Sequence, residues 1–185
     1  MCIRDRAIHY AKQMRIYTRT GDDGSTGLYF GGRVPKDHAQ VELNGTVDEA
    51  QAFLGWSRSL TDSASQVHAL IADIQRDLWI LMAEVATATE QRGKLTAGKD
   101  MVTTEMVEKI ERAIDEWTEI VGPITEFVIP GTNTLSASLD ISRTVVRRAE
   151  RHAFGVLSGE SIVPVYLNRL SDLLWTLARA VEGKN

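Results

Sequence analysis

A stretch near the middle of this 185-residue chain, residues 65–89, carries apolar side chains at alternating spacings of three and four. This spacing draws one apolar stripe along a helix, and a helix of that length buries such a stripe against other helices. The stripe consists of Val67, Ile71, Ile74, Leu78, Leu81 and Val85. The segment therefore favours a bundle of helices over any sheet-based fold.

Four further segments have a helical pattern. Thr46 and Glu49 have the spacing of a capping box, which predicts a helix that opens at Thr46 and ends near residues 58–60. Another helix is expected over 104–121, where Gly122-Pro123 stops it, and two more over 140–151 and 164–182. Strand patterns are almost absent. We therefore expect an all-α fold, a five-helix bundle, with one core for the whole chain.

The composition limits the classes of function. A net charge of −4 argues against a nucleic-acid binder, and no apolar run is long enough to cross a membrane. Cys2 is the only cysteine, so an intrachain disulfide is excluded and a cytoplasmic location is the default expectation. Residues 1–13 lack the apolar core of a secretory signal; we treat them as an N-terminal extension and 14–185 as the domain.

A glycine-rich loop over residues 15–36 precedes the first predicted helix. It holds five glycines and several hydroxyls, and such a backbone can bring its amides close to phosphate oxygens. Arg33 and Lys36 follow and can neutralise a polyphosphate. The loop contains no Walker A motif, and a plain surface turn would have the same composition.

The helix over 140–151 reads DISRTVVRRAER and has one strongly charged face. Arg143 and Arg147 stand four apart, so they repel each other by roughly 0.2–0.5 kcal/mol unless an anion lies between them. Arginine suits a polyphosphate or a fixed carboxylate, because it offers a planar fork of donors and keeps its charge. The alternative is a solvated face on which Asp140 pairs with Arg143, and Glu150 pairs with its arginine neighbours.

Other candidate residues have ordinary structural explanations. Asn168, on the last helix, wants polar partners, which a ligand or a neighbouring helix can supply equally. Asp48 can favour a helix N-terminus, and Phe127 is more often a core residue than a ligand contact. No Glu-x-x-His motif, zinc ligand set or catalytic triad occurs, so we expect no metal held by side chains; His68 and His152 read as surface or packing residues.

Taken together, six segments resemble the PduO-type ATP:corrinoid adenosyltransferases in order and spacing, from Met14 to about Arg179. They are RIYTRTGDDGSTGL, GGRVPK, NGTVDEAQAFLG, FVIPG, SRTVVRRAER and YLNRLSDLLW. Each motif alone is modest, whereas six in sequence are specific. The resemblance implies a cobalamin adenosyltransferase-like five-helix bundle with a glycine-rich N-terminal loop, assembled as a homotrimer with ATP and corrinoid at the subunit interfaces.

The same resemblance implies a role for each matching residue. Arg143 would pair with Asp48 across the interface, and Phe127 would lie against the corrin ring and help to keep the lower ligand off cobalt. The expected ATP contacts come from the loop and from the arginine helix of the adjacent subunit. They are Thr18, Arg19, Thr20, Gly21, Thr26, Gly27, Lys36, Arg147, Arg148, Glu150, Arg151 and Asn168.

The implied reaction transfers the 5′-deoxyadenosyl group of ATP to Co(I) of a corrinoid and releases triphosphate. Cobalt is the nucleophile, which agrees with the lack of a side-chain triad. Mg2+ would enter with the ATP phosphates. A reductase would supply the electron that makes Co(I) from Co(II), and an adenosylcobalamin-dependent enzyme would take the product.

Some positions depart from the family pattern. Thr132 stands where glycine is common, Asp140 replaces a frequent histidine, and VDEAQA stands for VDELNS. Thr132 and Asp140 border the expected corrinoid side, so they bear on corrinoid preference more than on the reaction. Two other functions stay open: a carrier or sensor of adenosylcobalamin that makes no cobalt–carbon bond, and an ATP-hydrolysing switch, although the latter lacks Walker motifs.

Overall fold

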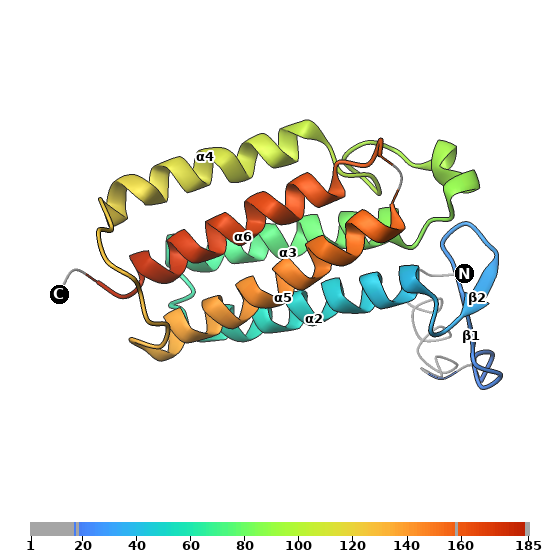
Figure 1. The fold of residues 1–185 in the computed structure, drawn as a ribbon, viewed down its shortest axis with the longest axis horizontal. Helices are drawn as coiled ribbons and strands as arrows, with labels where there is room; N and C mark the ends of the chain where they lie inside the picture. The colour runs from blue at the N-terminus through green and yellow to red at the C-terminus, as the bar shows by residue number, and fades with distance from the viewer. Residues whose placement is uncertain (1–16, 18, 158, 184–185) are drawn as a thin grey trace, which may run out of the picture.

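The computed structural model describes residues 17, 19–157 and 159–183, and Figure 1 shows a bundle of long helices with a small hairpin at one end. The expected all-α five-helix bundle is confirmed for this part of the chain. A 3-10 helix, η1, and two short antiparallel strands complete it. The elements are β1 (Ser25–Gly27), β2 (Arg33–Pro35), α2 (Ala39–Ser59), α3 (Gln66–Val85), η1 (Thr89–Lys94), α4 (Thr104–Val121), α5 (Thr134–Val156) and α6 (Val163–Ala180).

Helix α5 lies at the centre of the packing, between α2 and α6, while α3 packs on α2 and α4 packs on α6. The stripe foreseen on α3 is buried, as are the leucines on the inner face of α6. Helices α2 and α5 run antiparallel: Thr46 meets His152 near one end and Ser57 meets Ser142 near the other. No helix among the described residues is long and apolar enough to cross a membrane.

Three helix ends follow from their capping residues. Ser65 caps α3 by accepting from the amide of His68, and Gly122 ends α4 in the left-handed region, with φ of 73°. A capping box opens α5, where Asn133 accepts from the amide of Ser136 and the Ser136 hydroxyl accepts in return. The predicted stop of α4 is therefore confirmed with its mechanism.

The predicted start of the first helix is wrong. Helix α2 begins at Ala39, where the His38 imidazole accepts from the amide of Gln40. Thr46 lies inside the helix and its hydroxyl donates to the carbonyl of Glu42, one turn earlier. Burial of Leu43 extends the helix back through the segment that the capping-box motif had excluded.

Hydrogen bonds connect the hairpin and the start of α2 to the C-terminal end of α3. The amide of Tyr29 donates to the carbonyl of Ala86, and the Gln40 side chain donates to the carbonyls of Val85 and Thr87. These bonds satisfy acceptors that the end of a helix leaves open. Helix α3 therefore stops at Val85, earlier than expected, and η1 occupies part of the connection that we had read as irregular.

Candidate functional site

The glycine-rich loop is a built structure: β1 pairs with β2, so that Thr26 lies opposite Val34. Arg33 holds the turn, because its guanidinium donates to the carbonyl of Thr20 and to the hydroxyl of Ser25. The hairpin was not foreseen from the sequence, since three-residue strands leave almost no pattern. Of the predicted loop residues, Arg19, Thr20, Gly21, Thr26, Gly27 and Lys36 lie in this one unit, and Thr18 lies outside the described residues.

Lys36 lies directly over Gly21. A side chain at Gly21 would place its Cβ 3.3 Å from Lys36 Nζ and 3.0 Å from the carbonyl oxygen of Ser25, so only glycine fits without a shift. Within the described part of the chain, no carboxylate pairs with the Lys36 ammonium. The loop therefore presents a cation beside a bare stretch of backbone, which is a suitable surface for an anion.

The acidic residue of the turn is already used internally. Asp23 accepts from the hydroxyl and the amide of Ser25 at 2.7 and 2.9 Å. These bonds, helped by the nearby Arg33, lower the pKa of the Asp23 carboxyl. Asp23 therefore stays ionised and shapes the turn, and it is not arranged as a ligand for a cation.

The exposed stripe of α5 carries two arginines, Arg147 and Arg151. Arg147 and Arg151 stand one turn apart on this stripe, and no described carboxylate pairs with either of them. Two guanidiniums in this position repel each other until an anion binds. The alternative prediction, in which Glu150 pairs with these arginines, is therefore wrong.

Arg148 and Glu150 face the neighbouring helices instead. Arg148 forms an ion pair with Glu49 of α2. Glu150 accepts from the side-chain amide of Asn168 at 2.9 Å, and the Asn168 oxygen accepts from Arg169. Asn168 is half-buried, as expected for an asparagine on this helix, and it ties α5 to α6 beside the exposed arginines.

Arg143 and Asp48 are not paired within one chain. Arg143 donates through Nε to Asp140, at 3.0 Å, as in the local pairing considered from the sequence. In the antiparallel register set by Ser57 and Ser142, Arg143 lies opposite the region of Gly55. Asp48 is about seven residues, or roughly 10 Å, further along α2, and it is exposed. Its position inside α2 also makes the helix N-terminus interpretation of Asp48 wrong.

Phe127 is fully exposed in the segment between α4 and α5, so the core interpretation of this residue is wrong. Ile129, two residues on, is 85% exposed. Large apolar side chains so exposed on a connecting segment mark a contact surface. The segment lies at the opposite end of the bundle from the hairpin (Figure 1).

A match to a family model covers almost the whole chain: the model described as cobalamin adenosyltransferase matches residues 16–181. The chain belongs to the cobalamin adenosyltransferase family. A corrinoid adenosyltransferase of Citrobacter freundii is 41% identical over 174 residues, which are 91% of this chain and 95% of that protein. One from Mycobacterium bovis is 38% identical, over 91% of this chain and 89% of that protein.

Solved structures of the family have the same fold. A variant of the PduO-type ATP:corrinoid adenosyltransferase of Lactobacillus reuteri, complexed with cobalamin and ATP, superposes with a TM-score of 0.80. It is 28% identical, and the match covers 91% of this chain and 93% of that one. A second variant of the same protein, complexed with ATP, gives a TM-score of 0.78 at 29% identity, over 90% and 93% of the two chains.

One charged cluster was missed by sequence reasoning. The carboxylate of Asp140 is buried between α5 and α6, where Arg143 and Arg179 both donate to it. In the sequence, Arg179 stood out only as the approximate end of the family resemblance. The spacing of Asp140 and Arg143 was visible in the sequence, but no local signal connects Asp140 to Arg179, 39 positions away.

Proposed function

We infer that this protein transfers the 5′-deoxyadenosyl group of ATP to the Co(I) of a corrinoid. Co(I) attacks C5′ with its electron pair, a cobalt–carbon bond forms, and the C5′–oxygen bond breaks. Triphosphate leaves with the electrons of that bond. The observation that carries the inference is membership of the family over residues 16–181, together with two exposed arginines at the matching motif that have no carboxylate partner among the described residues.

The nucleotide site that we propose combines the hairpin and the arginine helix. Arg19, Thr20, Gly21, Thr26, Gly27 and Lys36, with Thr18, would surround ATP, while Arg147, Arg148, Glu150, Arg151 and Asn168 would complete the site from an adjacent subunit. The charge balance supports this arrangement, because Lys36, Arg147 and Arg151 have no anionic partner among the described residues. A triphosphate supplies the missing charge.

Mg2+ fits this site as an ion carried by the phosphates. The described residues contain no group of three or more His, Cys, Asp or Glu side chains that could cage a metal. Mg2+ commonly takes only one or two carboxylates besides phosphate oxygens and water. Glu150 is the carboxylate of the arginine stretch, and its Oε1 is already engaged by Asn168.

The corrinoid side that we propose includes Phe127, Arg143 and Asp48. Phe127 would lie against the corrin ring and hinder the lower ligand, which favours four-coordinate cobalt and eases its reduction. A reductase would supply the electron, the cytoplasm is the compartment proposed, and an adenosylcobalamin-dependent enzyme would receive the product. Preference among cobalamin and its precursors would depend on Thr132 and Asp140, which border this side.

A homotrimer is proposed because the family resemblance implies three subunits, and an oligomer is needed because one subunit does not bring the two halves together. The hairpin and the segment between α4 and α5, which carries Phe127, lie at opposite ends of the bundle, whereas reacting atoms must approach to about 3–3.5 Å. The roughly 10 Å offset between Asp48 and Arg143 likewise suits a pair made between copies. The exposed stripe of α5 carries Phe154, 72% exposed, at one end, which suits burial in an interface. Light scattering should give a mass three times that of one chain.

An anaerobic assay tests the reaction directly. Purified protein is mixed with Mg-ATP and chemically reduced cobalamin, the visible spectrum is followed, and the phosphate product is identified. We expect adenosylcobalamin and one triphosphate per turnover. Binding of both ligands without a new cobalt–carbon bond would favour a carrier or sensor, and release of phosphate or diphosphate would favour an ATP-hydrolysing switch.

A further inference from the structure

The buried cluster at the Phe127 end of the bundle joins three helical residues and one after the last helix. Asp140 Oδ1 accepts from Arg143 Nε at 3.0 Å, and Asp140 Oδ2 accepts from Arg179 Nη2 at 2.6 Å. Arg179 Nη2 also lies 3.0 Å from Glu182 Oε1, as a charge contact. The side chains of Asp140 and Arg179 are 6% and 3% exposed, whereas Arg143 is 24% exposed.

This exposure gradient divides the cluster into an anchor and a presented group. Arg179 and Asp140 are buried, so their orientation is set by the protein interior. Arg143 uses only its Nε edge for Asp140, and no described residue accepts from its two terminal nitrogens, which are left for another acceptor. A guanidinium that is held by one edge loses less side-chain entropy when the other edge binds.

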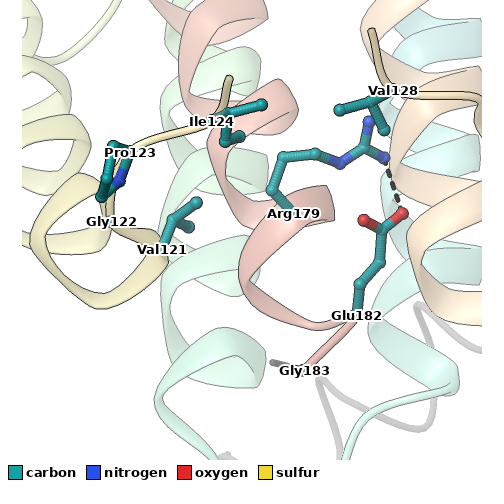
Figure 2. Close-up of a pocket in the computed structure, with 8 residues that line it drawn as sticks. All are labelled: Val121, Gly122, Pro123, Ile124, Val128, Arg179, Glu182 and Gly183. Carbon is teal, nitrogen blue, oxygen red and sulfur yellow. Dashed lines mark ion pairs between the residues drawn. The ribbon is translucent and has the colours of Figure 1, made fainter. Parts of the chain in front are cut away.

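The anchor also connects to the segment that carries Phe127. Arg179 and Glu182 line a cavity of about 460 Å³ together with Ile124 and Val128, which flank Phe127 in sequence (Figure 2). No described group accepts from the buried Nε of Arg179. The same arginine therefore pairs with the carboxylate that holds Arg143 and lines the cavity that Ile124 and Val128 also line.

We propose that Asp140 is a positioning residue for Arg143, with Arg179 as its anchor, and that the Asp140–Arg179 pair orients the Arg143 guanidinium toward the corrinoid side of the site. This rests on the proposed function. It assigns a role to the position where the chain departs from the histidine frequent in the family. Asp140 is buried, so it acts on a corrinoid through Arg143 and not by direct contact.

The competing explanation is that the cluster only stabilises the fold. Buried ion pairs often do no more than satisfy each other, and removing one partner destabilises any protein. A drop in melting temperature in a variant therefore decides nothing. A useful test has to separate the orientation of Arg143 from the stability of the bundle.

The first measurement needs no activity. In protein labelled with 15N-arginine, the Nε–H signal of Arg143, assigned by its loss in Arg143→Lys, should show a hydrogen-bonded shift and slow exchange. Asp140→Asn should move it toward the values of a free arginine. A free-arginine signal in the wild-type protein would overturn the proposal, even if the enzyme is active, and a held signal in an inactive protein would count against the proposed function alone.

The second measurement is a double-mutant cycle on kcat/KM for the corrinoid, with Asp140→Asn, Arg143→Ala and the double variant. We expect Asp140→Asn to cost about tenfold in the wild-type background and less than twofold when Arg143 is absent. Equal losses in both backgrounds would mean a structural role. Asp77→Asn, a carboxyl-to-amide change between α3 and α6, is the matched control, and its effect should be the same in both backgrounds.

If Asp140→Asn fails to fold, Asp140→His replaces it in both measurements. Histidine is frequent at this position in the family, so the bundle should accept it. Neutral imidazole can accept from Arg143 but cannot neutralise Arg179, so an intermediate Nε–H shift and an intermediate coupling are expected. Coupling that stays at the wild-type level with a free Nε–H signal would overturn the proposal.

Discussion

The two ends of the bundle differ in the charge and the polarity of their surfaces. The hairpin end has a tight backbone, an internally bonded Asp23, and Lys36 over Gly21. The opposite end has Phe127 and Ile129 in the open, above a buried cluster in which the charges of Arg179 and Asp140 balance. One end offers the Lys36 ammonium, which no described carboxylate pairs with, beside bare backbone, and the other offers apolar surface.

Under the proposed function, this difference suits a small, highly charged donor at one end and a large, flat acceptor at the other. Charge is stabilised by fixed donors, while a broad ring is held by apolar contact and by exclusion of water. Helix α2 alone, with 21 residues, is about 30 Å long. Because one chain keeps the two surfaces that far apart, the comparison predicts that changes at the two ends affect different substrates.

The largest effect is expected for Arg147→Ala on the exposed stripe of α5. Losing a charge-assisted triphosphate contact within an interface should reduce kcat/KM for ATP on the order of 100-fold, with little change in corrinoid affinity. Steady-state kinetics with each substrate varied in turn measure kcat/KM for ATP and for the corrinoid separately. The matched control is Arg112→Ala, an exposed arginine of α4 paired only with Glu108. Unchanged ATP kinetics would remove Arg147 from the site.

Phe127→Ala should impair the use of the corrinoid more than that of ATP, the reverse of the effect of Arg147→Ala. We expect a loss of roughly tenfold or more with Co(II) corrinoid under reducing conditions, because an exposed aromatic anchor is removed, and nearly normal ATP binding. The same enzyme given pre-reduced Co(I) should recover most of its rate. Trp79→Ala, an exposed aromatic of α3, is the control. An equal loss on Co(I) would contradict the role proposed for Phe127.

Gly21→Ala tests the hairpin end with a smaller change. The added Cβ would meet the Ser25 carbonyl oxygen and displace the Lys36 ammonium, so ATP binding should weaken by roughly five- to tenfold. Gly93→Ala, in η1 with open space around it, should leave binding as it is. Isothermal titration with ATP compares the three proteins. Equal affinities would show that Lys36 does not depend on the bare backbone.

The smallest effect concerns a carboxyl that belongs to neither end. Burial raises the pKa of Asp77, against the opposing influence of Lys109 and the Tyr166 hydroxyl. The stability that protonated Asp77 contributes is therefore present below the pKa of the unfolded chain and is lost as pH rises through the raised pKa. Asp77→Asn should melt no more than about 2 °C higher than wild type at neutral pH, and this gain should vanish in acid. A gain that is the same at all pH values would contradict this account.

The sequence by itself determined the helical class, the family and both ends of α4, whereas α5 extends beyond the expected 140–151 at both ends, to Thr134–Val156. Stripes such as Val67 to Val85 and stops such as Gly122 depend on neighbours in the chain, so local chemistry specifies them. The start of α2 predicted from the sequence is wrong. Burial of Leu43 and capping by His38 outweigh the capping motif at Thr46. Tertiary packing overrides local capping preferences when the free energies of capping are this small.

Only the tertiary structure decided which charges remain unpaired and what holds Arg143. Arg147, Arg148 and Arg151 look alike in sequence, yet Arg148 meets Glu49 of another helix while the other two face outward. The contact between Asp140 and Arg179 joins positions far apart along the chain. No local pattern encodes such a pairing, because it exists only once two helices pack in one register and exclude water from the charges between them.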